Sequence, residues 1–224
     1  TCELAAELGQ SLRIARLYSG QPAARITQAL ADGRIAPLTP APEISAGLIG
    51  ELTNIVALAG AEQVQAALAS GADIILCGRT TDTAIIAALP LLRGDHAGGA
   101  WHGAKIAECG ALCSTNPTSG VIMVDFDAAG FSVEPMALDA ACTPHSVSAH
   151  MLYENADPFI LHEPGGHLDV RGASYLALDA RRVRVEGSIW QPAPYTVKLE
   201  GARIAGYQTT ILATLRAPHY VAHA

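Results

Sequence analysis

The stretch from residue 61 to residue 92 is the feature that most constrains the fold. A helix is predicted over 61–70, because Val64, Ala67 and Leu68 recur at helical spacing. Gly71 ends this helix, and the short apolar run 73–76 that follows is typical of a buried parallel strand. A second helix is predicted over 82–92. Helix, glycine, strand, glycine and helix in this order are typical of a doubly wound sheet.

The remaining residues divide into a helix-rich first half and a strand-rich second half. The first half opens with the end of a helix over 2–8, followed by a strand over 12–17 and a helix over 23–32, and it closes with a helix over 103–113. The second half contains a predicted hairpin of strands 121–126 and 131–134, a helix over 146–155 capped by Ser146, and strands over 182–187, 195–199 and 203–215, the last two joined by a turn over 200–202.

These elements predict an α/β fold. We expect a doubly wound, three-layer sheet with helices on both faces in residues 1–118, and a β-rich α+β part in residues 119–224 that continues the same domain or forms an adjoining one. Because the chain starts inside a predicted helix and stops without a closing element, we interpret it as part of a longer chain, truncated at both ends.

The composition argues against several classes of protein. Half of the residues are hydrophobic, 5% are aromatic, and the formal net charge is −7. Lysine occurs only at Lys105 and Lys198, and no stretch concentrates basic residues, so neither nucleic-acid binding nor membrane binding is expected. Five cysteines without a Cys-x-x-Cys pair, and a chain that opens without a signal peptide, favour free thiols in the cytoplasm. We therefore expect a small-molecule or protein partner.

The loop that leaves the predicted strand at its carboxyl end is the first candidate site, because ligands of open α/β sheets bind there. Gly78 permits close approach of the backbone, Thr80 and Thr81 lie at the helix start, and Arg79 can bind a carboxylate or phosphate bidentately. Asp82 can act as a base or orient a hydroxyl group. The structural alternative is a turn, a helix cap, a solvated arginine and an aspartate that favours the helix dipole. The glycine pattern is that of neither a dinucleotide-binding turn nor a P-loop.

Glu108 and Cys109 form the second candidate, in a helix made otherwise of small residues. A carboxylate in such surroundings can have a raised pKa and act as an acid or a base. The structural alternative is a buried, inert thiol beside a carboxylate on the wet face of the helix.

A third candidate lies around a predicted helix start near residue 145. His145 can face a ligand held there, and Tyr153 and Asn155 can hydrogen-bond a substrate, although Asn155 also fits an ordinary helix end. His145 and His150 do not share a helix face, so no metal site is predicted, and the sequence does not identify a cofactor.

The motif His162-Glu-Pro-Gly-Gly-His167 is interpreted as a tight loop. Pro164 and the two glycines forbid the helical turn that would align the histidines as in a metalloprotease. A glycine-rich loop of this kind can still approach a ligand. No Gly-x-Ser-x-Gly elbow occurs, which argues against an ordinary α/β-hydrolase.

Several of these segments resemble one family. The chain is similar to the acyclic terpene utilisation AtuA family in the stretches 54–58, 71–82, 108–111, 148–158 and 195–201, which follow in the family's order. The resemblance favours functional roles for Arg79, Asp82, Glu108 and Cys109, and Asn54, which opens the first stretch, joins the candidate substrate-binding residues. Cys77 stands where the family has an aliphatic residue or threonine, so no role is assigned to it.

The family also implies a context. Its members are bacterial or fungal, are longer than this chain, and have a further strand with a glycine-rich turn before the position of Thr1. Many relatives pair with a small partner domain or subunit, and some lie near genes for the breakdown of branched acyl-CoA compounds or carboxylic acids.

Three functions remain open at this point. The leading hypothesis is a catabolic lyase or hydratase, most simply a hydro-lyase, acting on a small carboxylate or acyl-CoA, in a chain that forms a homo-oligomer. The second is a non-catalytic ligand-binding or scaffolding subunit of a carboxylase or hydratase complex. The third is a hydrolase with Cys109 as nucleophile, which requires a histidine nearby.

Overall fold

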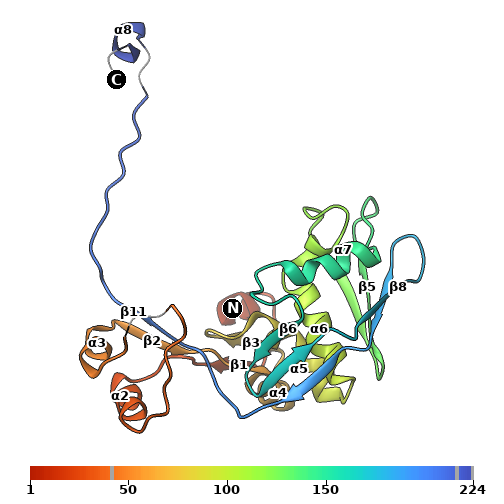
Figure 1. Ribbon diagram of the computed structural model, residues 1–224, viewed down its shortest axis with the longest axis horizontal. Helices are drawn as coiled ribbons and strands as arrows, with labels where there is room; N and C mark the ends of the chain where they lie inside the picture. Colours follow the sequence, from red (N-terminus) through yellow and green to blue (C-terminus); the bar gives the residue numbers. More distant parts are fainter. Residues whose placement is uncertain (41–42, 215–216, 223–224) are drawn as a thin grey trace.

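The computed structural model describes residues 1–40, 43–214 and 217–222, without the side chain at position 220, and has a mixed α/β architecture (Figure 1). The first half contains most of the helices. Its elements are α1 (Cys2–Glu7), β1 (Ile14–Leu17), α2 (Ala23–Ala31), α3 (Ala46–Glu51), β2 (Asn54–Ala57), α4 (Ala61–Ala69), β3 (Ile74–Cys77), α5 (Asp82–Arg93), α6 (Ala97–Ala107) and the 3-10 turn η1 (Gly110–Cys113).

The second half is rich in strands. Its elements are β4 (Ile122–Phe126), β5 (Gly130–Pro135), α7 (Pro144–Ala149), the 3-10 turn η2 (His150–Leu152), β6 (Ile160–Glu163), β7 (Gly166–Asp169), β8 (Ser174–Ala177), β9 (Val183–Glu186), β10 (Ile189–Pro192), β11 (Leu199–Ala202) and α8 (Pro218–Val221). The predicted α/β class with a β-rich second half is confirmed.

The strands of the described residues form several small sheets. β1 and β3 are parallel, with Ile14 opposite Ile74, as the helix–strand–helix pattern predicts. β4, β5, β9 and β8 form an antiparallel sheet, β10, β7 and β6 form another, and β11 pairs antiparallel with β2. A parallel bridge between Ala59 and Thr80 connects the chain after β2 to the loop after β3.

Helix α6 lies at the centre of the larger hydrophobic core because its glycines let the neighbouring backbones approach closely. All residues from Gly98 to Ile106 are buried. A Cβ atom built on Gly99 would lie 2.7 Å from Cα of Gly130, and one on Gly103 would lie 2.4 Å from the ring of Phe126. The core around α6 includes Ala84, Ala104, Phe131, Leu168 and Val185, so it draws on both halves of the chain.

Two predicted helices have different boundaries in the structure. The helix expected over 103–113 begins at Ala97, where the His96 side chain accepts a hydrogen bond from the Gly99 N–H at 3.0 Å, and ends at Ala107. The positive φ of Gly110 separates it from η1. The helix expected over 146–155 begins at Pro144 and ends at Ala149, before η2.

The cap of α7 was also predicted wrongly. Thr143, and not Ser146, is the N-cap, and the two residues form a reciprocal capping box. Proline at the first helical position fits this start, since its missing N–H has no partner inside the helix.

The strands expected over 195–199 and 203–215 were predicted at the wrong positions. No regular strand covers 195–198, and the residues 200–202 expected in a turn belong to β11. Residues 203–214 have no regular secondary structure, and they extend away from the rest of the molecule (Figure 1); position 215 lies outside the described residues. The β-prone side chains of 203–214 do not form a strand because no other described strand pairs with them.

A smaller core lies beside the larger one. Ile26 of α2, Ile49 of α3 and Ile55 of β2 pack together, with Leu199 of β11 against them. Figure 1 shows these four elements grouped on one side of the molecule. No helix in the described part of the chain combines the length and apolar character needed to cross a membrane.

Candidate functional site

A cleft of about 240 Å³ opens where the chain leaves β3 and enters α5. Its lining combines threonine hydroxyls with basic and acidic side chains from distant parts of the sequence. The lining residues are Leu58, Arg79, Thr80, Thr81, Asp82, Thr83, Lys105, Glu108, Glu154, Asn155, Leu161, His162, Glu163 and Lys198. Of the residues predicted from sequence, the cleft brings together Arg79, Thr80, Thr81, Asp82, Glu108 and Asn155.

The loop between β3 and α5 is fixed by backbone contacts on both sides. Gly78 lies against Ser19, and a Cβ atom built on Gly78 would lie 2.5 Å from the Ser19 hydroxyl oxygen, so only glycine fits here without a shift. The Arg79 N–H donates to that oxygen at 2.9 Å. The Thr81 N–H donates to the Ala59 carbonyl at 3.0 Å, and no described side chain caps α5 at Thr81. The first N–H groups of α5 therefore have no side-chain cap at Thr81 among the described residues, and the residues at this helix start line the cleft.

Two cations at the cleft share one carboxylate. Arg79 Nε lies 3.3 Å from Glu200 and Lys198 Nζ lies 2.9 Å from it. The hydrogen bond from Lys198, followed by that from Arg79, lowers the pKa of Glu200. The Leu58 N–H donates to the Lys198 carbonyl at 3.0 Å, which holds this part of the chain beside β2.

A buried ion pair lines the cleft. Lys105 of α6 donates to Glu108 one turn later, and their side chains are only 4% and 8% exposed. Burial raises the pKa of Glu108, and the hydrogen bond and charge of Lys105 oppose this effect. The negative charges of Asp82 and Glu154 raise it further.

Glu163 is one of the cleft residues that sequence reasoning missed, together with Lys105 and Lys198. It ends β6, and its Oε1 accepts a hydrogen bond from the Thr83 hydroxyl of α5, 80 residues earlier in the chain. Its Oε2 is buried and has no hydrogen-bond partner among the described residues. Burial raises the pKa of Glu163, while the hydroxyls of Thr83 and Thr81 oppose the shift. The available sequence signal was a carboxylate directly before the predicted Pro-Gly-Gly loop.

The segment after η2 borders the cleft. Asn155 donates from its side-chain amide to the Met151 carbonyl at 2.9 Å, and Glu154 has a φ of 54°, in the left-handed region. Tyr153 stacks on His150, and Lys105 Nζ lies 5.8 Å from the centre of the Tyr153 ring. Tyr153 is therefore next to the Lys105–Glu108 pair but outside the lining of the cleft.

Cys109 also lies outside the cleft lining, next to Glu108. Cys109 is the N-cap of η1, whereas the prediction placed it inside a helix. Burial, followed by the negative charge of Glu108, raises the pKa of the Cys109 thiol, and a hydrogen bond with Tyr153 opposes this. These surroundings disfavour the thiolate that a cysteine nucleophile requires.

Three other candidates do not line the cleft. Asn54 pairs with Ala202 at the start of β2, and His145 is exposed in the first turn of α7. Gly78 supports the loop through its contact with Ser19.

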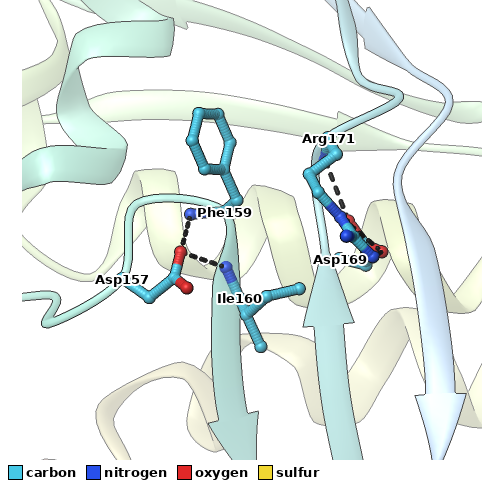
Figure 2. Close-up of polar contacts among 5 residues, drawn as sticks. All are labelled: Asp157, Phe159, Ile160, Asp169 and Arg171. Carbon is cyan, nitrogen blue, oxygen red and sulfur yellow. Dashed lines mark hydrogen bonds and ion pairs between the residues drawn. The ribbon is translucent and has the colours of Figure 1, made fainter.

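Two aspartates fix the end of the β6–β7 hairpin opposite Glu163. Figure 2 shows Asp157 turned back toward β6, where its Oδ1 accepts from the N–H groups of Phe159 at 2.7 Å and Ile160 at 3.2 Å. Asp169 at the end of β7 accepts from the backbone and side chain of Arg171, which lowers its pKa to about 2. The turn at Pro164 and Gly165 joins the two strands, as the tight-loop interpretation predicts.

No group of three or more His, Cys, Asp and Glu side chains among the described residues is arranged to hold a metal ion. The groups that fit an anion are Arg79, Lys198 and the N–H groups at the start of α5.

The fold and the cleft define an α/β protein with a polar, partly buried cleft at a strand-to-helix crossing. A family model described as acyclic terpene utilisation family protein AtuA matches residues 1–224. The chain therefore belongs to the AtuA family, and the resemblance noted from the sequence is confirmed. No curated protein and no solved structure matches it.

Proposed function

We propose that this chain carries the binding and proton-transfer site of a lyase or hydratase that acts on a small carboxylate or an acyl-CoA. The observation that most supports this function is the presence of two largely buried carboxyl groups, Glu108 and Glu163, in one cleft with Lys105. Carboxyl groups removed from water, with pKa values shifted toward neutrality, are suited to general acid–base catalysis. Membership of a family involved in acyclic terpene utilisation agrees with a role in catabolism.

The ligand's negative group would bind at the entrance of the cleft. Arg79 and Lys198 are held there by Glu200. A ligand carboxylate or phosphate would replace the Glu200 carboxylate on Arg79, because the guanidinium group can bind such a group bidentately. The N–H groups at the start of α5 would contribute further hydrogen bonds.

Glu108 would act as the base of the reaction. Its ion pair with Lys105 favours the charged form, while burial keeps that form reactive. Asp82 is the alternative base, since it lines the same cleft from the first turn of α5. Lys105 would also stabilise negative charge that develops on the ligand's carbonyl oxygen.

A thermal-shift screen of the purified chain against carboxylates, acyl-CoA esters and inorganic phosphate tests this proposal. A ligand that binds only the native state raises the melting temperature by mass action. We expect one class of carboxylate or acyl-CoA to raise it, and Arg79→Ala to lose most of that shift. Arg203→Ala is the matched control, because Arg203 forms a similarly exposed ion pair, with Glu51, away from the cleft. Equal shifts in the wild type and Arg79→Ala would contradict the assignment.

A second candidate is a scaffolding subunit, and the segment 203–214 favours it. Ile204, Tyr207, Ile211 and Leu212 are 67% to 96% exposed on a segment that extends away from the rest of the molecule (Figure 1). A second copy of the chain or a small partner domain would cover such side chains. This candidate predicts that Tyr207→Asp with Leu212→Asp lowers the molar mass measured by light scattering, alone or with a co-expressed partner. An unchanged mass would leave the enzyme as the better proposal.

A further inference from the structure

We infer that Glu163 is the proton donor of this site and that the substrate carries a hydroxyl group on the carbon β to its carboxylate or thioester. This inference rests on the proposed function and deepens it, because it names the acid and the leaving group. It starts from the placement of Glu163 at the end of β6, in the same cleft as Glu108 but held by a different set of partners.

The two oxygens of Glu163 have different surroundings. Oε1 accepts a hydrogen bond from the Thr83 hydroxyl, and the Thr81 hydroxyl also lowers the pKa of the carboxyl group. Oε2 is buried and lacks a hydrogen-bond partner among the described residues. A buried oxygen without a partner costs more on a charged carboxylate than on a neutral carboxyl group, so this position favours the protonated form, whose proton a bound ligand can accept. The geometry therefore leaves Oε2 as the position from which Glu163 donates to a bound substrate.

The charges that face Glu163 favour its neutral form. Asp82 of α5 and Glu108, directly after α6, act on it as negative charges. The cleft also contains Glu154, His162 and three cations, but Lys105 is engaged by Glu108, and Arg79 and Lys198 by Glu200. The partners of Glu163 are thus neutral threonine hydroxyls, whereas the partner of Glu108 is the positively charged Lys105. Two nearby carboxyl groups with such unequal partners divide into one acid and one base.

This division defines the reaction. The Glu108 carboxylate removes the proton on the α carbon, and the electron pair of that C–H bond forms the C=C bond. The β C–O bond breaks, its electron pair stays on the oxygen, and that oxygen takes the Glu163 proton and leaves as water. Glu163 ends ionised and Glu108 ends neutral, and exchange of protons with solvent restores both. The substrate and product are a β-hydroxy acid or thioester and its α,β-unsaturated counterpart, and hydration is the same sequence in reverse.

A change of leaving group tests the role of Glu163 separately from its effect on structure. Chloride leaves without a proton, so elimination from β-chlorobutyryl-CoA does not need an acid, whereas dehydration of β-hydroxybutyryl-CoA does. Glu163→Gln keeps the size and polarity of the side chain but cannot transfer the proton. We expect Glu163→Gln to lower kcat on the hydroxy substrate by about 100-fold or more, with a small change on the chloro substrate and in KM.

Matched variants complete the experiment. Glu108→Gln removes the base and should lose elimination on both substrates. Glu43→Gln makes the same chemical change at an exposed position outside the cleft and should lose neither. The wild-type kcat for dehydration should also fall as pH rises and Glu163 ionises, and this fall should be absent from the chloro substrate.

The outcomes separate the two proposals. Full activity of Glu163→Gln on the hydroxy substrate overturns the inference and leaves the proposed function in place. Equal loss on both substrates, with an unchanged melting temperature, assigns Glu163 a positioning role and also overturns it. A wild-type chain that eliminates from neither substrate overturns the proposed function and this inference together.

Discussion

At the scale of single residues, the polar groups of the cleft compete for a small number of partners. Arg79 and Lys198 share the single carboxylate of Glu200, Lys105 forms an ion pair with Glu108, and Glu163 accepts a hydrogen bond from the Thr83 hydroxyl. Replacing one partner therefore changes the charge state or the availability of its neighbour, and the direction of each change follows from the contacts.

Glu200→Gln should strengthen binding of an anionic ligand. The variant removes the Glu200 carboxylate that Arg79 and Lys198 share. A ligand carboxylate can then bind these cations without first displacing Glu200. Isothermal titration calorimetry with the ligand class found by thermal shift would measure a lower Kd, most clearly at low salt. Weaker binding by Glu200→Gln would show that Glu200 positions Arg79 rather than competing for it.

Lys105→Met should destabilise the protein strongly at neutral pH. The change leaves the Glu108 charge buried without its partner, which typically costs about 3–5 kcal/mol. The loss should shrink as pH falls, because Glu108 then becomes neutral. Urea unfolding at pH 5 and pH 8 checks this, with Lys105→Met/Glu108→Leu as the control that removes both charges. An equal loss at both pH values would contradict the burial argument.

His102 should make the protein less stable in acid. It is fully buried, its ring contacts the Ser188 hydroxyl at 2.7 Å and the Tyr175 hydroxyl at 3.2 Å, and burial lowers its pKa from 6.5 to about 3. Below pH 6.5 the unfolded chain binds a proton that folded His102 does not, so stability falls with pH until about pH 3, by up to about 1.4 kcal/mol per pH unit. His102→Gln loses packing to the same extent at every pH. Its free energy of unfolding, measured with urea, should therefore fall less steeply than that of the wild type between pH 6.5 and about pH 3. A parallel fall would contradict the assignment.

At the scale of elements, α6 illustrates how glycine allows close packing in the middle of a helix. Gly98 and Gly99 precede the stacked Trp101, and Gly103 lies against Phe126 and Phe131. Glycine destabilises a helix because the unfolded chain is more flexible at glycine. Here the close packing that only glycine permits outweighs this cost.

Gly99→Ala should destabilise the protein although alanine favours helix. The added Cβ atom would meet the Gly130 backbone at 2.7 Å, and overpacking of this kind costs about 1–3 kcal/mol. Gly50→Ala is the matched control, since Gly50 lies in α3 with open space around it and should gain up to about 1 kcal/mol. Thermal unfolding of both variants measures the contrast, and a more stable Gly99→Ala would contradict it.

Elements with strong local signals could be predicted from the sequence, and those defined by distant pairing could not. Helices α2, α4 and α5, strands β1 and β3 and the β4–β5 hairpin match their predicted positions, because periodicity and glycine placement mark them. Strands β6, β7, β10 and β11 have four residues each, too few for a clear alternating pattern, and β11 pairs with β2 from a distant part of the sequence. Glu163 was missed for the same reason, since its contact with Thr83 spans 80 residues.

At the scale of the whole molecule, two hydrophobic cores and a peripheral segment divide the chain. The larger core surrounds α5 and α6, and the smaller one joins α2, α3 and β2 to β11. Arg203 forms an ion pair with Glu51 just after β11, and residues 204–214 are exposed.

Limited proteolysis should therefore cut first between 204 and 214. Chymotrypsin should cleave after Tyr207 and Leu212, which are 96% and 94% exposed, before it cleaves after Tyr175 in β8. The remaining fragment should keep its melting temperature, because both cores lie before residue 203. Mass spectrometry and circular dichroism of the fragment check this. Early cleavage within 61–190 would show that the larger core is less stable than its burial indicates.

The most direct test of the central claim is hydrogen–deuterium exchange with and without the carboxylate or acyl-CoA that raises the melting temperature. If the ligand binds in the cleft at the start of α5, backbone amides in 79–84, 105–109 and 160–163 should exchange more slowly when it is present. Arg79→Ala should lose this protection. Protection confined to other parts of the chain, with these three segments unchanged, would contradict the account.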